Sequence, residues 1–165
     1  MIKTTVWTVF LCIIAGILQS TLLGKIAFFN VVPDLALCIM VYSAYVNGTM
    51  TGQISGFFSG LLLDFLSAAP LGLNCLIRTL IGALAGVFKG SFFLDIFFMP
   101  VILCALATII KAAILFILNL IMGPVVPAYS LTSYVFWVEL GINSLSAPLL
   151  FFLLKRIKYL LIERR

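Results

Sequence analysis

Apolar runs about as long as a membrane-crossing helix follow one another along almost the whole chain, with only short turns between them. A helix that crosses a bilayer needs about 20 mainly apolar residues, with a range of roughly 17–25. Hydrophobic residues make up 64% of the 165 residues and charged residues only 9%, whereas soluble proteins have roughly 45–50% apolar and about 25% charged residues. No water-soluble fold could bury this much apolar surface. The chain is therefore predicted to be an all-α integral membrane protein, which excludes a cytoplasmic enzyme, a nucleic-acid-binding domain and a secreted disulfide scaffold.

The apolar runs divide into six predicted transmembrane helices. The second would begin at Pro33, a residue that fits the first turn of a helix, and would end at Asn47. Because all the turns are short, successive helices are expected to pack as antiparallel neighbours in one domain that spans residues 1–165. The predicted helices cover approximately residues 4–23, 33–47, 49–66, 73–89, 97–122 and 131–154.

The distribution of basic residues predicts the orientation in the membrane. Six crossings place both termini on the same side, and that side would carry seven basic residues against one, Lys25, on the other. An excess of lysine and arginine marks the cytoplasmic face, so both termini are predicted to be cytoplasmic. The seven residues are Lys3, Lys89, Lys155, Arg156, Lys158, Arg164 and Arg165.

Glycines recur every fourth residue on the third and fourth predicted helices, and each series includes one charged residue at its end. The third helix carries Gly52, Gly56 and Gly60 followed by Asp64, and the fourth carries Arg78 followed by Gly82 and Gly86. Residues four apart share one face of a helix, and glycine on that face lets two backbones approach closely. The two glycine stripes therefore predict a tight contact between these helices.

The charges at the ends of the stripes predict a buried ion pair. Because the two helices are antiparallel, Asp64 and Arg78 would lie at similar depth near the extracytoplasmic side. An isolated charge in a bilayer costs about 2.5–3.5 kcal/mol on insertion scales, and a partner of opposite sign relieves that cost. We therefore expect an Asp64–Arg78 ion pair.

A second ion pair is predicted between the fifth and sixth helices. Lys111 lies near the middle of the fifth helix, and Glu139 lies about two turns into the sixth. Charges within a membrane almost always face protein or a wet cavity, where they find partners. The pair could hold helices together, or it could serve a channel or a proton-coupled carrier, and the sequence leaves both uses open.

Catalytic chemistry has little support in the sequence. The chain has no histidine, and its four cysteines (Cys12, Cys38, Cys75 and Cys104) lie singly in apolar runs. Without histidine there is no Ser–His or Cys–His pair, and scattered cysteines are typical of small apolar core residues. Asp34 is expected to cap the second helix rather than to form an aspartyl dyad with Asp64. No catalytic, metal-binding or cofactor-binding residue is predicted.

The stretch from Pro33 to Gly86 resembles the rod shape-determining protein MreD family. That family has a P-D start to its second helix, a G-x-x-x-G-F-x-x-G-L-L-x-D third helix, a P-L-G turn and a glycine-containing fourth helix. Here these motifs correspond to Pro33-Asp34, to the run from Gly52 to Asp64, to Pro70-Leu71-Gly72, and to Gly82 and Gly86. The length, the hydropathy and the basic C-terminus also agree with the family.

The resemblance implies a non-enzymatic inner-membrane subunit of the bacterial cell-elongation complex. Family members work with MreC, a single-pass protein, and with the actin-like MreB, in a complex that includes RodA and a class B penicillin-binding protein. The implied function is to scaffold an MreC-like protein and to regulate lateral peptidoglycan synthesis and cell shape. The partners expected are these proteins and membrane lipid, with no nucleic acid and no cofactor. The two glycine stripes are the expected docking surface for the single-pass partner.

The MreD family is also similar in size and topology to the substrate-binding subunits of energy-coupling factor vitamin transporters, and this similarity supplies the alternative function. Such a subunit would need an outward-facing pocket with converging polar groups. It would also need small residues on the first helix to dock a coupling subunit, for which Cys12, Gly16 and Ser20 are candidates.

Overall fold

The computed structural model describes residues 2–21, 31–67, 69–90, 98–126 and 133–161. They form the helices α1 (Ile2–Thr21), α2 (Leu35–Asn47), α3 (Thr49–Leu66), α4 (Leu73–Val87), α5 (Phe98–Met122) and α6 (Tyr134–Arg156), with the 3-10 turn η2 (Gly123–Val125) after α5 and the single turn α7 (Lys158–Leu161) at the end. The helix ends predicted at residues 22–23, 97 and 131–132 lie outside the described residues. Each other predicted end lies within two residues of the observed one.

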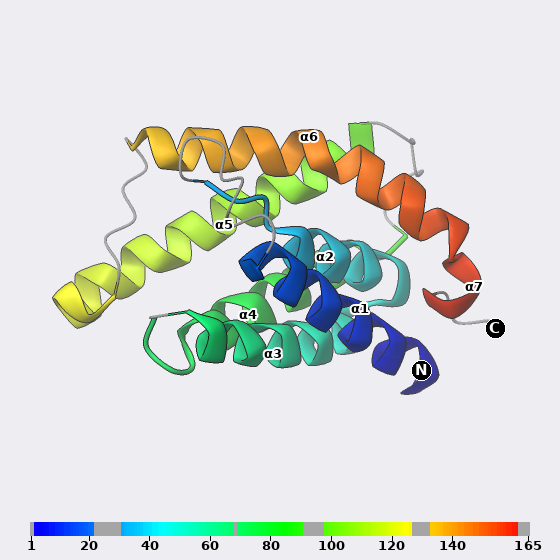
Figure 1. The fold of residues 1–165 in the computed structure, drawn as a ribbon, viewed down its shortest axis with the longest axis horizontal. Helices are drawn as coiled ribbons and strands as arrows, with labels where there is room; N and C mark the ends of the chain where they lie inside the picture. The colour runs from blue at the N-terminus through cyan, green and yellow to red at the C-terminus, as the bar shows by residue number, and fades with distance from the viewer. Residues whose placement is uncertain (1, 22–30, 68, 91–97, 127–132, 162–165) are drawn as a thin grey trace.

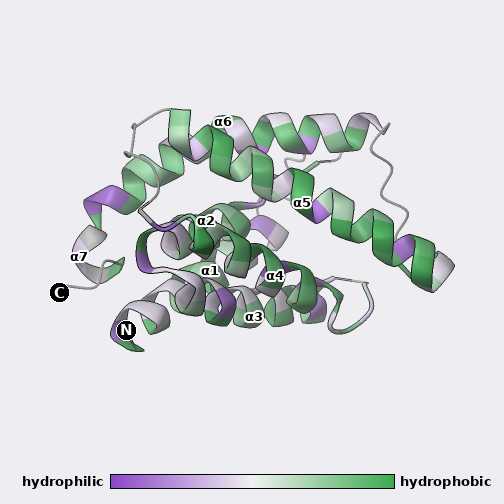
Figure 2. Ribbon diagram, turned by 180° about the vertical axis from the view of Figure 1, so that it is seen from behind, coloured by the Kyte–Doolittle hydropathy of each residue, from purple (hydrophilic) through white to green (hydrophobic). Residues whose placement is uncertain are grey.

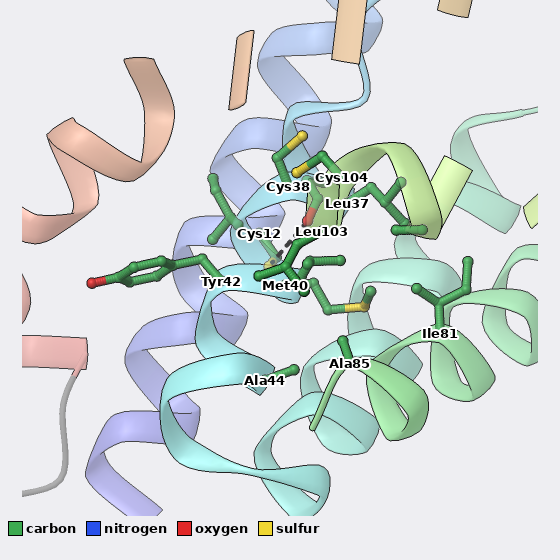
Figure 3. Packing of buried hydrophobic residues seen from close by; sticks show 14 of the residues in the cluster. Cys12, Leu37, Cys38, Met40, Tyr42, Ala44, Ile81, Ala85, Leu103 and Cys104 are labelled. Atoms are coloured by element: carbon green, nitrogen blue, oxygen red, sulfur yellow. Dashed lines mark hydrogen bonds between the residues drawn. The ribbon is translucent and has the colours of Figure 1, made fainter. Parts of the chain in front are cut away.

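Helix α2 lies at the centre of the molecule, between α5 and α6 on one side and α3 and α4 on the other (Figure 1). It is apolar on every side, and such a helix is stable only when other helices surround it. All ten residues from Ala36 to Tyr45 are buried. In the core, the sulfur atoms of Cys38 and Cys104 point toward each other, and Cys12 Sγ lies 3.7 Å from the carbonyl oxygen of Ala36 (Figure 3). All four cysteines are free and buried, as expected for core residues.

A single residue, Gly48, connects α2 to α3. Its φ of +104° lies in the region that glycine adopts without a side-chain clash, and its N–H donates to the carbonyl of Ala44 at 2.7 Å. The chain can therefore end one helix and begin the next within one residue. This sharp reversal sets α3 antiparallel to α2.

The predicted tight contact between α3 and α4 is present, and the two glycine stripes form it. A Cβ atom at Gly52 would overlap the backbone carbonyl of Gly82, and one at Gly56 would overlap the carbonyl of Arg78. Gly60 lies in the same way against Asn74, and Gly86 against the backbone of Thr49. The glycines of both stripes are therefore buried in the contact between α3 and α4. The expectation that they form the docking surface for a partner is wrong.

Helix α1 packs its small residues against α2 and α3. Thr8 Oγ1 and Ser43 Oγ share a hydrogen bond of 2.6 Å, and Thr5 Oγ1 lies 3.5 Å from Thr51 Oγ1. Further along, Cys12 is fully buried and Gly16 lies against the side chain of Leu62. The small-residue face of α1 is therefore an internal contact.

Both ends of the described chain lie at the same end of the molecule, where α1 and α7 are in contact (Figure 1). The turn between α2 and α3 lies there too, because Asn47 Nδ2 donates to the carbonyl of Leu161 at 2.7 Å. Lys89, just after α4, donates from Nζ to the carbonyl of Asn47 at 2.7 Å. We call this the terminal end of the molecule.

Three of the described helices, α1, α5 and α6, are long and apolar enough to cross a membrane. Helices α2 and α4 are apolar but have only 13 and 15 residues, and the polar residues of α3 lower its hydropathy. Seen from behind, α5 is hydrophobic over most of its length (Figure 2). The described helices that are long enough to span a membrane are therefore packed together with shorter or more polar ones.

Candidate functional site

Asp34, the residue just before α2, lies at the centre of a buried charge network. Its Oδ1 accepts a hydrogen bond from the N–H of Leu37 at 3.1 Å, so it caps α2 as predicted. With 13 residues, α2 is about 20 Å long, which is shorter than the roughly 30 Å of a bilayer core. Since α2 ends at the terminal end of the molecule, its other end lies well inside. Asp34 therefore needs a counter-charge in the interior.

Arg78 on α4 supplies that charge. Its Nη2 donates to Asp34 Oδ1 at 2.5 Å, and the two side chains are only 4% and 8% exposed. The predicted Asp64–Arg78 ion pair is therefore wrong, because Arg78 pairs with Asp34 instead.

The register of the glycine contact explains this difference. Moving four residues along α3 from Gly52 to Gly56 moves the facing position on α4 four residues back, from Gly82 to Arg78. Continuing the series, Asp64 lies level with the turn before α4, which begins at Leu73, five residues before Arg78. At 1.5 Å per residue, those five residues span about 7.5 Å along the helix axis. The two residues therefore lie at different depths, although both are near the same turn in the sequence.

Asp64 instead holds the start of α4. Its two carboxylate oxygens accept hydrogen bonds from the backbone N–H groups of Gly72 (2.9 Å), Asn74 (2.9 Å) and Cys75 (3.1 Å), and Oδ1 also accepts from Asn74 Nδ2 at 3.0 Å. The N-cap position of α4 is Gly72, which has no side chain for capping. Asp64 acts as the cap from the neighbouring helix, where the positive end of the helix dipole favours a carboxylate.

Lys111 and Glu139 form an ion pair, with Lys111 Nζ 2.6 Å from Glu139 Oε1. Lys111 Nζ also lies 3.6 Å from Asp34 Oδ2. The predicted Lys111–Glu139 pair is thus present, and Asp34 joins it to Arg78 in one network of Arg78, Asp34, Lys111 and Glu139. With two cations and two anions, this network has no net formal charge.

Two neutral side chains complete the network. Asn143 on α6 accepts from the backbone N–H of Asp34 at 2.8 Å through Oδ1. Its Nδ2 donates to Thr108 Oγ1 on α5 at 3.1 Å, and both side chains are fully buried. Asn143 lies four residues after Glu139, and Thr108 lies three residues before Lys111, so each shares a helix face with a charged residue. Thr108 was not predicted to belong to the site, although its spacing of three residues from Lys111 was a signal for it in the sequence.

A cavity of about 460 Å³ adjoins the network. The charged residues of the network line one part of it, and the end of α1, the segment before α2 and the facing ends of α3, α4 and α6 line the rest. The lining residues are Gln19, Ser20, Val31, Val32, Asp34, Leu63, Ser67, Asn74, Arg78, Lys111, Val135 and Glu139. The cavity therefore has both polar and apolar walls.

The described residues contain no group of three or more histidine, cysteine, aspartate or glutamate side chains that could hold a metal ion. The arrangement can do two things chemically. It joins four structural elements through buried charges, and it presents donors and acceptors to the cavity.

Comparison with known families decides what kind of protein this is. The family model described as rod shape-determining protein MreD matches residues 1–157 of the chain. The chain belongs to the MreD family. It is therefore an all-helical membrane protein with a role in determining rod shape. No match was found among curated proteins or among solved structures.

The structure gives a physical role to each motif that carried the resemblance to the MreD family. The P-D start holds the charge network through Asp34, and the glycines of α3 form the backbone contact with α4. The aspartate that ends the α3 motif, Asp64, caps α4 at the P-L-G turn. In this member of the MreD family, the motif therefore encodes how α2, α3 and α4 fit together.

Proposed function

We propose that this protein is a non-enzymatic scaffold subunit of the bacterial cell-elongation complex in the inner membrane. It binds an MreC-like single-pass protein and helps to regulate lateral peptidoglycan synthesis, together with MreB, RodA and a class B penicillin-binding protein. The observation that carries this proposal is the match of the MreD family model to residues 1–157. The long apolar helices at the periphery support recognition within the membrane.

The orientation that we propose places both termini in the cytoplasm. Lys3, Lys89, Lys155 and Arg156 belong to segments at the terminal end of the molecule, and a cluster of basic residues is typical of the cytoplasmic face. The contact between α1 and α7 supports an arrangement with both termini on one side. Lys25, the basic residue expected on the opposite side, lies outside the described residues.

We assign the docking surface for the single-pass partner to α6, since the glycine stripes of α3 and α4 face each other. Trp137, Gly141 and Leu145 lie four residues apart on one exposed face of α6. Among the described residues, no atom lies within 4 Å of the position that a Cβ atom would occupy at Gly141, and Trp137 and Leu145 are 62% and 83% exposed. An exposed glycine between two large side chains leaves a notch into which a partner helix can pack closely.

The test combines depletion with site-specific cross-linking in the bacterium that encodes the protein. Depletion is expected to give round or swollen cells. A photo-cross-linking residue in place of Gly141 should trap an MreC-like protein, whereas one in place of Leu84, on the exposed face of α4, should not. Normal rod shape after clean deletion would overturn the function. Equal capture at both positions would overturn the assignment to α6.

The vitamin-transporter alternative gains no support. Of the three small residues that would dock a coupling subunit, Ser20 is exposed, but Cys12 and Gly16 are packed against α2 and α3. They are therefore closed to such a partner.

A further inference from the structure

The cavity beside the charge network contains an unused hydrogen-bond donor. Arg78 is only 3% exposed, and its Nη2 donates to Asp34. The other terminal nitrogen, Nη1, is buried and has no hydrogen-bond partner among the described residues. A buried charged donor without an acceptor loses its hydration and gains nothing in return, so such groups normally have a partner. Arg78 lines the cavity, so a molecule bound there can supply the missing acceptor once the guanidinium turns Nη1 toward it.

The charges around Arg78 limit what that molecule can be. Lys111 already contacts both Glu139 and Asp34, and these four groups balance one another. A ligand with several negative charges would leave the buried site strongly anionic, which the low dielectric of the interior disfavours. A guanidinium binds phosphate oxygens with short, charge-assisted hydrogen bonds. Among phosphate groups, one that carries a single negative charge shared among its oxygens therefore disturbs this balance least.

The size and the position of the cavity agree with a headgroup of that kind. A volume of about 460 Å³ lies within the roughly 300–1,000 Å³ typical of small-molecule sites. Arg78 lies five residues from the start of α4, which is about 7.5 Å along the helix axis. Gln19 and Asn74 add polar groups to the wall, and Val32 and Leu63 add apolar surface. We propose that this cavity binds a monoanionic phosphodiester, with one of its oxygens accepting a hydrogen bond from Arg78 Nη1.

A phosphodiester of this kind can come from a membrane lipid or from a water-soluble compound. Phosphatidylglycerol and its deacylated form, glycerophosphoglycerol, carry the same headgroup and the same single charge. The full-length protein, purified in detergent and stripped of lipid, is mixed with each of them. Native mass spectrometry then counts bound molecules, and a titration of thermal stability gives the affinity.

Two tryptophan variants test the site without touching the charge network. Val135→Trp fills the cavity from α6, whereas Leu153→Trp adds the same bulk to an exposed position on the same helix. We expect wild type and Leu153→Trp to bind the phosphodiester, and Val135→Trp to lose the binding. Arg78→Lys keeps a cation for Asp34 but removes Nη1, and it should weaken binding about tenfold or more.

Binding of the lipid alone supports a membrane lipid as the ligand. Binding of both compounds supports a site that recognises only the headgroup. Equal binding by Val135→Trp and Leu153→Trp, or no binding of either compound by the wild type, would overturn the proposal. Because the measurement uses the isolated protein, its failure leaves the scaffold function and the cross-linking at Gly141 to be judged separately.

Discussion

The guanidinium of Arg78 on α4 lies 2.5 Å from the carboxylate of Asp34 at the start of α2. This contact joins the tightly packed α3–α4 pair to the central helix, and through Lys111 it extends to α5 and α6. Removing one member of a buried pair leaves an uncompensated charge, which typically costs about 3–5 kcal/mol. The stability of the whole bundle is therefore expected to depend on this pair.

A double-mutant cycle tests which acid pairs with Arg78. Asp34→Asn and Arg78→Gln should each destabilise the protein, and the double variant should lose less than the sum of the two. We expect a coupling free energy of about 0.5–3 kcal/mol from unfolding in denaturing detergent. The matched control is Asp64→Asn with Arg78→Gln, for which the effects should add. Coupling in the Asp64 cycle and additivity in the Asp34 cycle would contradict the structure.

Loss of the Asp64 carboxylate should loosen the start of α4 rather than the charge network. Asp64→Ala removes the acceptor for the N–H groups of Gly72, Asn74 and Cys75. Loss of a cap costs about 0.5–2 kcal/mol. Hydrogen–deuterium exchange should rise at these amides and stay unchanged in the middle of α4. Unchanged exchange at residues 72–75 would show that Asp64 is not the cap.

Bulk at Gly56 should harm folding far more than bulk at Gly141. A Cβ at Gly56 would overlap the backbone of Arg78, and forcing extra atoms into such a contact costs typically about 1–3 kcal/mol or more. Gly141 has open space, so Gly141→Ala should keep or raise the stability, since alanine favours a helix by about 1 kcal/mol over glycine. Thermal unfolding of Gly56→Ala and Gly141→Ala checks this difference. Equal destabilisation of the two variants would count against the observed register.

Loss of Lys111 should be partly rescued when the charge of Glu139 is also removed. Lys111→Met leaves Asp34 and Glu139 with Arg78 as the remaining cation of the network, whereas the double change Lys111→Met with Glu139→Gln restores the balance of charge. We expect the double variant to accumulate in the membrane at a higher level than Lys111→Met alone. Quantitative immunoblotting of membrane fractions measures this level. A double variant as depleted as the single one would argue against charge balance as the cause.

Cysteine labelling tests the orientation of the chain. All four native cysteines are buried, so a new cysteine on the surface can be detected against a low background. Ala69→Cys, near the α3–α4 turn, should react with a membrane-impermeant maleimide in intact cells. Met50→Cys, at the start of α3 and 57% exposed, should react only after the cells are permeabilised. The reverse pattern would invert the topology.

Much of the architecture could be predicted because it depends on local spacing. Apolar run lengths predicted the helices, and the fourfold spacing of Gly52, Gly56 and Gly60 predicted a face that allows close contact. The cap at Asp34 followed from its position after Pro33 and before an apolar run. Each of these features depends on residues within one helix or at its end, so a periodic pattern is enough to reveal it.

Local sequence patterns are enough to predict an all-helical membrane protein with tight glycine contacts and buried charges that require partners. Which of these charges meet depends on how the helices pack. Arg78 lies 14 positions from Asp64 and 44 from Asp34, yet it pairs with the more distant residue. The choice depends on depth, which is set by the short length of α2 and by the register of α3 against α4. The packing of the helices sets the depth of each charged residue. A buried charge then pairs with the opposite charge that this packing brings to the same depth.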